Sequence, residues 1–424
     1  MLAEIHPSKL SGTVVAPASK SHSVRALFFA AFAQTPSDLH HLLEADDTAV
    51  MIHCLRTLGA KITTVGTVTT VEPIPCFKLK KPLTLYVGKS GLAYRLMTAV
   101  AVLFDQPITI DGDHSIRTRR PITPLVAALK EMGCSVTTQK NGCAPLDIEP
   151  KPFSRFTSIQ STDSQPITAL IYLAALSKEA FSISYSGCSE RPWLQLSLAW
   201  LRFLNIPYMA TASNVHLFSH QGFSGFTYQT PGDWSAVSFF IAASIIHTTP
   251  FSIQGIDLID TQPDKAMLFL FEELGGRFDY DDQQRTLSLT PPLQAQGVTF
   301  DLERGIDLLP ILAVLGCFLT TDTHLYNGAI ARQKESDRIH AMSLELKKMN
   351  AQIKTTPDGL IISPSCLRGA TVDSHSDHRI AMALAIGASK ALGITTIRGI
   401  DCIHKTFPQF FHVFMKINGQ VNFR

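Results

Sequence analysis

The segment LKEMGCSV, residues 129–136, carries the pattern that decides the fold: the end of an amphipathic helix, then glycine, then the start of a short strand. A helix commonly ends with a residue in the left-handed backbone region, where glycine has no steric penalty and asparagine a small one. The segment therefore predicts a helix that stops at Gly133 and a strand that follows directly.

The same pattern occurs six times along the chain of 424 residues. The stops lie in LRTLGAKI at Gly59, LKEMGCSV at Gly133, LRFLNIPY at Asn205, FEELGGRF at Gly275, LKKMNAQI at Asn350 and FMKINGQV at Asn418. Successive stops are 74, 72, 70, 75 and 68 residues apart. This nearly constant spacing indicates six copies of one αβ unit, each longer than the solenoid repeats of about 20 to 50 residues.

Length and composition indicate two domains and exclude several classes of protein. At 46.5 kDa the chain exceeds the usual size limit for one hydrophobic core, so we expect two domains with three repeat units in each. We expect the chain to pass from the third unit to the fourth near YQTPGDWS, residues 228–235. The formal charge of +2 does not fit a dedicated nucleic-acid binder. The eight cysteines form no CxxC pair, which gives no indication of a zinc site and favours a reducing compartment.

The apolar stretches of the chain are short. The two clearest apolar stretches are residues 169–176 and 238–246. Both are much shorter than the roughly 20 residues needed to span a bilayer, so we expect them to form buried helices. The N-terminal MLAEIHPSKLSG lacks the basic-then-apolar pattern of a secretory signal. We therefore expect a cytoplasmic protein that binds neither membrane nor nucleic acid.

Three basic segments in the first half of the chain are candidates for anion binding. They are PASKSHSVRALFFAAFA (17–33, with Ser19, Lys20, Ser21 and Arg25), VGKSGLAYRL (87–96, with Gly88 and Gly91) and DGDHSIRTRRPITPLVAALK (111–130, with Arg117, Arg119 and Arg120). A helix N-terminus attracts anions, and a guanidinium donates two parallel hydrogen bonds to carboxylate or phosphate. Taken singly, a capped helix, a plain turn and a solvated basic loop explain these segments at least as well.

Five further segments place polar side chains where a helix is expected to begin. They are STDSQPITAL (161–170, with Ser164 and Gln165), GIDLLPILAVLGCFL (305–319, with Asp307), ARQKESDRIHAMSLELKKM (331–349, with Arg332, Lys334, Glu335, Asp337 and Arg338), HSDHRIAMALAIG (375–387, with Asp377, His378 and Arg379) and HKTFPQFF (404–411, with Lys405). Asp307 either caps its helix or serves as a base. The charged runs, taken alone, are more typical of solvated turns.

Together and in this order, the eight segments resemble the 5-enolpyruvylshikimate-3-phosphate (EPSP) synthase family. The matching motifs are SKS...RAL, GD.S.R..RPI.PLV.AL, KESDR..AM..EL, DHR.AMA and KTFP.F, from about residue 11 to residue 415. The resemblance implies an α/β fold of the α+β type, a two-domain inside-out α/β barrel with three βαβαββ units in each domain. It implies one domain of residues 1–17 and 230–424, a second of residues 18–229, and an active site in the cleft between them.

The resemblance also implies which residues contact each substrate. Contacts to shikimate 3-phosphate are implied for Lys20, Ser21, Arg25, Ser164, Gln165, Trp193, Asp307 and Lys334. Contacts to phosphoenolpyruvate are implied for Lys20, Gly91, Arg120, Gln165, Arg338, Arg379 and Lys405. The implied catalytic residues are Lys20, Asp307, Lys334 and Glu335.

The reaction implied is transfer of the enolpyruvyl group of phosphoenolpyruvate to the 5-hydroxyl of shikimate 3-phosphate, with release of phosphate, in the shikimate pathway. Asp307, alone or with Lys334, takes the hydroxyl proton, while Glu335 protonates the methylene carbon. No metal or organic cofactor is required, and we expect a monomer. Two anionic substrates in an enclosed site need several cations to replace their lost hydration.

Five positions depart from the usual pattern of the family: Val24, Lys89, Leu92, Asp163 and Glu190. Asp163 and Glu190 stand where phosphate-binding serines are common, and carboxylates beside a bound phosphate should repel it. Lys89, in place of an asparagine, would compensate if it lies close enough.

Two alternatives stay open. One is a UDP-N-acetylglucosamine enolpyruvyl transferase. Such an enzyme typically has a reactive cysteine at the position of Ser115 in this chain. It also typically has the pair Lys-Asn at the position where this chain has Lys20 and Ser21. The other is a degenerate, non-catalytic anion binder of the same fold. The presence of Lys20, Asp307, Glu335, Arg379 and Lys405 argues against the degenerate form.

Overall fold

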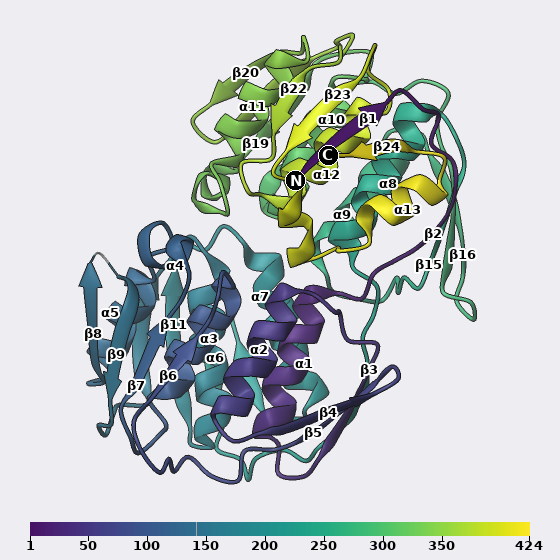
Figure 1. Cartoon of the computed structure of the whole chain (residues 1–424). Coiled ribbons are helices and arrows are strands. Elements are labelled where there is room, and N and C mark those ends of the chain that lie inside the picture. Colours follow the sequence, from purple (N-terminus) through teal and green to yellow (C-terminus); the bar gives the residue numbers. More distant parts are fainter. Residues whose placement is uncertain (141) are drawn as a thin grey trace. The chain divides into compact units, whose positions relative to one another are not determined.

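The computed structural model describes residues 1–140 and 142–424 (Figure 1). The chain divides into two compact units. Unit 1 comprises Met1–Ala18 and Pro231–Arg424, and unit 2 comprises Ser19–Thr230. Each unit encloses its own continuous cluster of buried apolar side chains, so each has an independent hydrophobic core.

Unit 2 contains three four-stranded sheets and seven helices among its described residues. In spatial order the strands are β14 (Thr227–Gln229), β3 (Ser37–His40), β5 (Val68–Glu72) and β4 (Lys61–Val65); β6 (Leu83–Tyr86), β7 (Ile108–Asp111), β9 (Cys143–Glu149) and β8 (Ser135–Lys140); and β10 (Phe156–Gln160), β11 (Phe181–Ser186), β13 (Asn214–Leu217) and β12 (Tyr208–Ala210). The helices are α1 (Lys20–Phe32), α2 (Asp46–Thr57), α3 (Gly91–Ala101), α4 (His114–Thr118), α5 (Thr123–Glu131), α6 (Ser164–Ser177) and α7 (Arg191–Phe203).

Unit 1 also contains three four-stranded sheets. In spatial order the strands are β16 (Arg277–Asp281), β17 (Thr286–Thr290), β15 (Phe251–Gln254) and β2 (Gly12–Val15); β18 (Thr299–Asp301), β19 (Thr323–Tyr326), β21 (Gly359–Ser363) and β20 (Gln352–Thr356); and β22 (Thr371–Asp373), β23 (Thr395–Arg398), β1 (Leu2–His6) and β24 (Gln420–Phe423). The α-helices are α8 (Trp234–His247), α9 (Ala266–Glu273), α10 (Leu309–Gly316), α11 (Arg338–Lys348), α12 (His378–Ala388) and α13 (Phe410–Lys416). Short 3-10 helices are η1 (Pro263–Lys265), η2 (Leu302–Arg304), η3 (Ile306–Leu308), η4 (Ala329–Gln333) and η5 (Ile400–Lys405).

All six sheets share one pairing scheme. In the sheet of β6 to β9, β6 and β7 are parallel, β7 pairs with β9 in antiparallel fashion, and β8 and β9 form an antiparallel pair at the other edge. The parallel pair requires a crossover, which a helix provides, whereas the antiparallel pair needs only a short turn. The expectation of six repeated βαβαββ units is confirmed.

The repeats are permuted along the chain, because the first strand completes the last sheet. Strand β1 lies between β23 and β24, with Ile5 opposite both Thr395 and Val421. Strand β14, the last of unit 2, is parallel to β3. Strand β2 is parallel to β15, although the whole of unit 2 separates them in sequence. Both chain ends therefore belong to unit 1.

Each predicted helix stop ends its helix in the left-handed conformation. The φ angles are 110° at Gly59, 92° at Gly133, 55° at Asn205, 89° at Gly275, 71° at Asn350 and 70° at Asn418. At each stop the next N–H bonds back to the carbonyl five residues earlier, as Ala60 does to Leu55 at 3.0 Å. This is the Schellman arrangement, in which otherwise unpaired carbonyls at the helix end accept hydrogen bonds. The prediction of six stops is confirmed.

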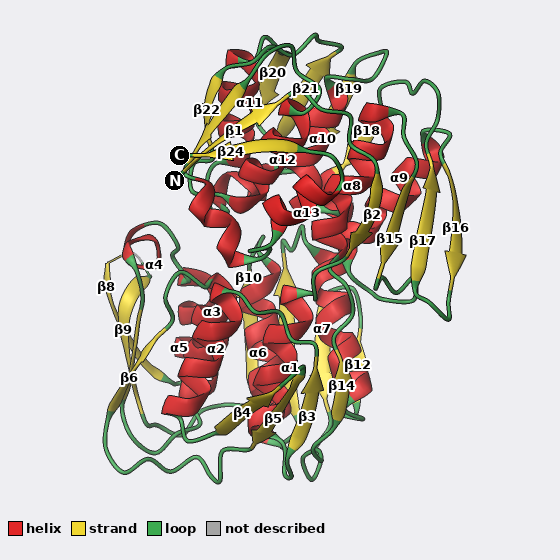
Figure 2. Ribbon diagram, turned by 45° about the vertical axis from the view of Figure 1, so that its right-hand side comes forward, coloured by secondary structure: helices red, strands yellow, loops and turns green. Residues whose placement is uncertain are grey.

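Three helices in each unit are buried on nearly all sides, while the sheets have one exposed face. Every residue of α8 is buried, and so are most residues of α1, α3, α6, α10 and α12. Strand β10 alternates exposed and buried residues, as a sheet covered on one face does (Figure 2). The two apolar stretches expected as buried helices lie in α6 and α8. Across the described part of the chain, every helix is too short or too polar to cross a membrane.

Substitution of Gly59 tests whether the left-handed conformation at this helix end requires glycine. An added Cβ would meet only Pro75 Cδ, at 3.9 Å, so Gly59→Ala adds backbone strain and little steric conflict. We expect the free energy of unfolding, measured by urea denaturation, to fall by about 1–2 kcal/mol, the cost of a left-handed non-glycine residue. Asn205→Gly, where the φ of 55° suits glycine, is the control and should cause no loss. Equal stability of Gly59→Ala and the wild type would contradict the proposed role of this glycine.

Candidate functional site

Several candidate residues lie where one of the buried helices begins. They are Lys20 and Ser21 at α1, Gly91 at α3, Ser164 and Gln165 at α6, Asp307 just before α10 and Arg379 at α12. Helices α3, α6, α10 and α12 each follow the first strand of their sheet, whereas α1 follows β2 and α8 follows β14. A helix N-terminus carries unpaired N–H groups and a partial positive charge, which together favour anions.

Arg338, the first residue of α11, is the centre of an ion-pair cluster in unit 1. Its side chain is 1% exposed. Nε donates to Asp377 Oδ2 at 2.8 Å, Nη1 to Asp307 Oδ1 at 2.5 Å and Nη2 to Glu335 Oε2 at 3.0 Å. Burial alone would lower the pKa of Arg338, but the three carboxylates raise that pKa well above its usual value. The guanidinium is therefore held charged, and it fixes three acidic side chains around itself.

The structure excludes one of the two interpretations of Asp307. The residue lies in η3, and the N-cap position of α10 is Leu308, so Asp307 does not cap that helix. Its carboxylate lies between two guanidinium groups instead. Arg338 binds Oδ1, and Arg379 Nη2 donates to Oδ2 at 2.8 Å. The cap interpretation is wrong, and the role of Asp307 as a base stays a prediction.

Asp264, in η1, is a second buried carboxylate beside Arg379. Its Oδ2 accepts a hydrogen bond from Ser235 and lies 3.8 Å from Arg379 Nη1. Burial raises the pKa of Asp264 to about 7, and the negative charge of Asp307 contributes to the increase. Arg379 thus has two acidic neighbours, of which Asp264 is fully buried.

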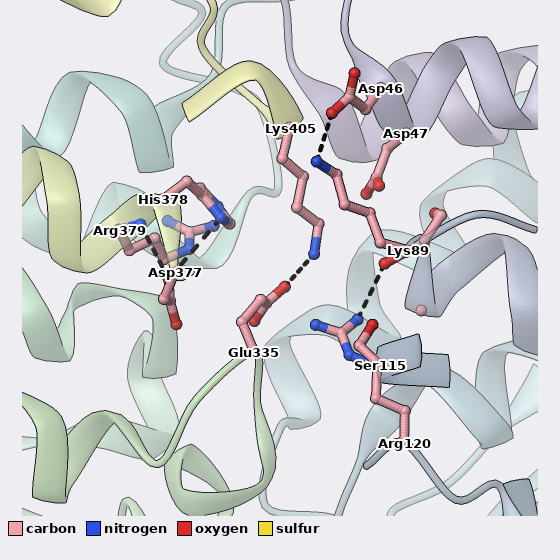
Figure 3. A network of polar contacts seen from close by, with 12 residues as sticks. Asp46, Asp47, Lys89, Ser115, Arg120, Glu335, Asp377, His378, Arg379 and Lys405 are labelled. Carbon is pink, nitrogen blue, oxygen red and sulfur yellow. Dashed lines mark hydrogen bonds and ion pairs between the residues drawn. The ribbon is translucent and has the colours of Figure 1, made fainter. Parts of the chain in front are cut away.

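Glu335 connects the Arg338 cluster to Lys405. Lys405 is the last residue of η5 and is buried, and its Nζ forms an ion pair with Glu335 Oε1 (Figure 3). The other oxygen of Glu335 accepts from Arg338. Lys334, the neighbouring residue in the chain, is half-buried and directly follows η4. The carboxylate of Glu335 is therefore placed between two cations.

The start of α12 belongs to the same cluster. Asp377 caps the helix, because its Oδ1 accepts a hydrogen bond from the N–H of Arg379 at 3.0 Å. His378 is buried at the first position of α12. Burial lowers the pKa of His378 well below its usual value, and the charge of Arg379 adds to this effect. His378 is therefore neutral at physiological pH.

In unit 2, Arg25 joins three helices. Its side chain lies within α1, and Nε donates to the hydroxyl of Tyr172 on α6 at 3.0 Å. Nη1 donates to the carbonyl of Ser21 at 3.0 Å, and Nη2 donates to Ser197 Oγ on α7 at 3.4 Å. Ser19, rather than Ser21, caps α1. Ser21 lies buried in the first turn.

Two lysines of unit 2 pair with consecutive aspartates of α2. Lys20, the first residue of α1, has its Nζ 3.8 Å from Asp47 Oδ2, and Asp47 is buried. Lys89 has its Nζ 2.7 Å from Asp46 Oδ2 (Figure 3). The expected cation at the start of α1 is thus held next to a buried carboxylate.

Gly91 is the point where α3 comes close to two arginines. A Cβ at this position would lie 2.8 Å from Arg120 Nη1, 3.1 Å from Arg95 Nη1 and 3.6 Å from Gln165 Oε1. Arg120 also donates to the carbonyl of Lys89 at 3.5 Å. The structure therefore brings together Gly91, Arg120 and Gln165, three of the residues expected to bind phosphoenolpyruvate.

The charge of Asp163 is balanced, but not by the residue that the sequence suggested. Asp163 caps α6, and its Oδ2 lies 2.9 Å from Arg95 Nη2. Lys89 pairs with Asp46 instead. The suggestion that Lys89 compensates for Asp163 is replaced by the pair of Arg95 and Asp163.

Ser164 and Trp193 both contact Glu190. The backbone N–H and the Oγ of Ser164 donate to Glu190 Oε2 at 3.0 and 3.1 Å. Trp193, half-buried in the first turn of α7, donates its backbone N–H to the Glu190 carbonyl at 3.0 Å. The expected phosphate-binding residues at the start of α6 are thus already hydrogen-bonded within the chain.

The predicted residues therefore form one cluster in unit 1 and a set around three helix starts in unit 2. Convergence of the two groups on shared substrates stays a prediction. The sequence analysis missed Asp264 and did not single out Arg95. Arg95 had a visible signal, since it is a cation four residues after Gly91 in an otherwise apolar helix. Within residues 1–140 and 142–424, no group of three or more His, Cys, Asp or Glu side chains is arranged to hold a metal ion.

Comparison with known proteins identifies the family. Residues 5–414 match the family described as EPSP synthase (3-phosphoshikimate 1-carboxyvinyltransferase). The chain is 39% identical to the 3-phosphoshikimate 1-carboxyvinyltransferase of Chlamydia abortus, over 99% of this chain and 94% of that protein. It is 36% identical to the 3-phosphoshikimate 1-carboxyvinyltransferase of Chlamydia pneumoniae, over 96% of this chain and 91% of that protein.

Two solved structures share the fold. EPSP synthase from Acinetobacter baumannii superposes with a TM-score of 0.80 at 20% identity, covering 100% of both chains. The enolpyruvyl transferase NikO from Streptomyces tendae superposes with a TM-score of 0.74 at 18% identity, covering 99% of this chain and 98% of that chain. The expected inside-out α/β fold is confirmed. The family match spans almost the entire sequence, and the chain belongs to the EPSP synthase (3-phosphoshikimate 1-carboxyvinyltransferase) family.

Proposed function

We propose that the chain transfers the carboxyvinyl group of phosphoenolpyruvate to the 5-hydroxyl of shikimate 3-phosphate and releases phosphate, the reaction of EC 2.5.1.19 in aromatic amino acid biosynthesis. The observation that carries the proposal is the complete acid–base cluster around Arg338 in a chain of this family. A degenerate anion binder would have no need to keep Asp307 and Glu335 beside three buried cations.

Each unit supplies part of the proposed binding site. For shikimate 3-phosphate we propose Lys20, Ser21, Arg25, Ser164, Gln165, Trp193, Asp307 and Lys334. For phosphoenolpyruvate we propose Lys20, Gly91, Arg120, Gln165, Arg338, Arg379 and Lys405. The partners are these two small molecules only, and the protein acts as a cytoplasmic monomer.

Binding of phosphoenolpyruvate is an exchange of anions. The cations proposed to bind it are already paired with carboxylates of the chain, because Arg338 and Arg379 hold Asp307, and Lys405 holds Glu335. A carboxylate held by cations is a weak base. When the substrate's carboxylate and phosphate take these cations, Asp307 and Glu335 are released. The substrate thus activates both acidic side chains as it binds.

The reaction then proceeds by addition and elimination. Asp307, alone or with Lys334, removes the proton of the 5-hydroxyl, and the hydroxyl oxygen forms a bond to C2 of phosphoenolpyruvate. Once released from Lys405 and Arg338, the Glu335 carboxylate takes up a proton from water and delivers it to C3, which becomes a methyl group in a tetrahedral intermediate. Loss of a proton from that methyl group and departure of phosphate restore the double bond. General acid–base transfers of this kind typically contribute about 10² to 10⁴-fold each.

A phosphate-release assay tests the function directly. With phosphoenolpyruvate present, we expect release with shikimate 3-phosphate and none with UDP-N-acetylglucosamine. Lys20→Met is the inactive control, because it removes a proposed substrate-binding cation that also pairs with buried Asp47. Its circular dichroism spectrum should match the wild type, since the cores are unchanged. Binding of shikimate 3-phosphate without turnover by the wild type would support the degenerate anion binder instead.

Substitution of Asp307 separates its catalytic role from its structural role. We expect Asp307→Asn to lower kcat by about 10² to 10⁴-fold, the usual contribution of a general base. The KM for phosphoenolpyruvate should not rise, because Arg338 and Arg379 lose a competing carboxylate. Asp301→Asn, which alters the N-cap of η2, is the matched control. A kcat close to the wild-type value would rule out Asp307 as the base.

Gly91→Ala tests the close approach of the arginines. The added Cβ would meet the mobile ends of Arg120 and Arg95, so these guanidinium groups must shift while the fold is retained. We expect the KM for phosphoenolpyruvate to rise about tenfold. The corresponding loss of binding free energy is no larger than one charge-assisted hydrogen bond contributes. Gly66→Ala adds backbone strain at a φ of 59° but meets no neighbour within 4 Å, so it controls for a loss of stability that does not move the arginines. An unchanged KM would show that Arg120 does not bind phosphoenolpyruvate.

A further inference from the structure

The segment that leads into α12 contains two consecutive residues in the left-handed backbone region. His375 and Ser376 have φ angles of 52° and 57°. They are the central residues of a turn, because the N–H of Asp377 donates to the carbonyl of Ser374 at 2.9 Å. Positive φ at both central residues is typical of a type I′ turn, where glycine, asparagine and aspartate are the usual residues. In other residues the Cβ crowds the following carbonyl oxygen, so the surrounding structure must hold this turn.

Glu345, on α11, makes the contacts that hold the turn. The residue is fully buried. Its Oε2 accepts a hydrogen bond from the N–H of Asp373 at 2.9 Å, and its Oε1 forms a hydrogen bond of 2.8 Å with His375 Nε2. Strand β22, which ends at Asp373, lies beside α11 (Figure 1). One carboxylate thus bonds to the residue before the turn and to the first central residue of the turn.

The hydrogen bonds of Glu345 replace the hydration that its carboxylate loses on burial. Lys348, three residues later on α11, donates from Nζ to both oxygens, at 2.9 and 2.8 Å. Burial of a carboxylate is costly unless such partners are present. An apolar side chain could fill the same space without that cost. The acidic residue is therefore accounted for by the turn that it holds.

The turn determines where two candidate residues lie. Asp377 is its last residue and accepts a hydrogen bond from Arg338, the first residue of α11. Arg379 follows in the first turn of α12. Helix α11 thus contacts the segment that leads into α12 at two places, through Arg338 at its start and through Glu345 about two helical turns further along.

We propose that Glu345 is a positioning residue, which holds the turn of residues 374–377 in its left-handed conformation and so places Asp377 and Arg379 for the reaction. The inference rests on the proposed function, which assigns Arg379 to phosphoenolpyruvate. Without the bonds from Glu345, the two central residues of the turn relax toward negative φ. The chain then enters α12 in a different direction, and Arg379 no longer meets the substrate at the same place.

The test combines Glu345→Gln with Ser376→Gly in the full chain. Glutamine fills the same space but keeps one acceptor oxygen in place of two. We expect the KM for phosphoenolpyruvate to rise about tenfold in Glu345→Gln, no more than one charge-assisted hydrogen bond contributes, with a smaller fall in kcat. Adding Ser376→Gly should restore the KM to within about threefold of the wild-type value, because glycine adopts a positive φ without being held.

Arg285→Gly is the matched control for the glycine substitution. Arg285 is an exposed residue of unit 1 with a φ of 49°, in the turn between β16 and β17, so glycine relieves similar strain there without altering α12. If Glu345 served stability alone, Glu345→Gln would lower the thermal unfolding midpoint and leave the KM unchanged. The positioning role predicts a raised KM that Ser376→Gly restores and Arg285→Gly does not.

His375→Ala tests the same contact from its other side. His375 is 30% exposed, so this change leaves the buried core intact even if Glu345→Gln does not fold. It removes the hydrogen bond between His375 Nε2 and Glu345 Oε1 but keeps the bond to the backbone. We expect the KM for phosphoenolpyruvate to rise about threefold, as the loss of one ordinary hydrogen bond gives.

Amide hydrogen exchange keeps the outcome independent of turnover. The N–H groups of Asp377 and Arg379 are hydrogen-bonded in the wild type, and we expect them to exchange about tenfold faster in Glu345→Gln and to regain protection with Ser376→Gly. Exchange or a KM that stays at the wild-type value in the folded variant would overturn the inference, as would equal restoration by Arg285→Gly. Failure of the wild type to turn over shikimate 3-phosphate would instead refute the proposed function, and hydrogen exchange would still decide whether Glu345 holds the turn.

Discussion

The structure depends on the electrostatic requirement of one buried guanidinium. Arg338 is almost completely removed from solvent, so its charge must be matched by nearby acidic groups, and Asp307, Glu335 and Asp377 provide them. Asp377 in turn caps α12, and Asp307 also holds Arg379. One charge therefore fixes the start of α12 and the position of two acidic side chains proposed to transfer protons. The same contacts that stabilise unit 1 arrange its proposed chemistry.

The repeated fold explains why such clusters arise in both units. Three helices form the interior of each unit: α1, α3 and α6 in unit 2, and α8, α10 and α12 in unit 1. Their sides are apolar and buried, so polar residues are tolerated mainly where the helices begin. Several candidate residues therefore lie at the starts of these helices, among them Lys20, Gly91, Ser164 and Arg379. Sites on rigid helix starts are also better positioned than sites on long loops.

The sequence predicted the repeat because its signal is local. A left-handed helix end needs glycine or asparagine, and this requirement holds at Gly59 as at Asn418 whatever surrounds them. The insertion of β1 between β23 and β24 depends on pairing across nearly the whole chain, and no local pattern indicates it. Asp264 was missed for the same reason, since its burial and its contact with Arg379 come from packing between distant segments. Asp307 was ambiguous because a cap and an ion-pair partner have the same appearance in a sequence.

In both units, acidic side chains of the chain already hold the donors of the candidate residues. In unit 1, Asp307 pairs with Arg379 and Glu335 pairs with Lys405. In unit 2, Glu190 and Asp163 accept hydrogen bonds from the N–H groups that begin α6. Under the proposed function, the affinity for each substrate is a difference between two sets of hydrogen bonds and not the sum of new contacts, because a bound anion replaces partners that these donors already have.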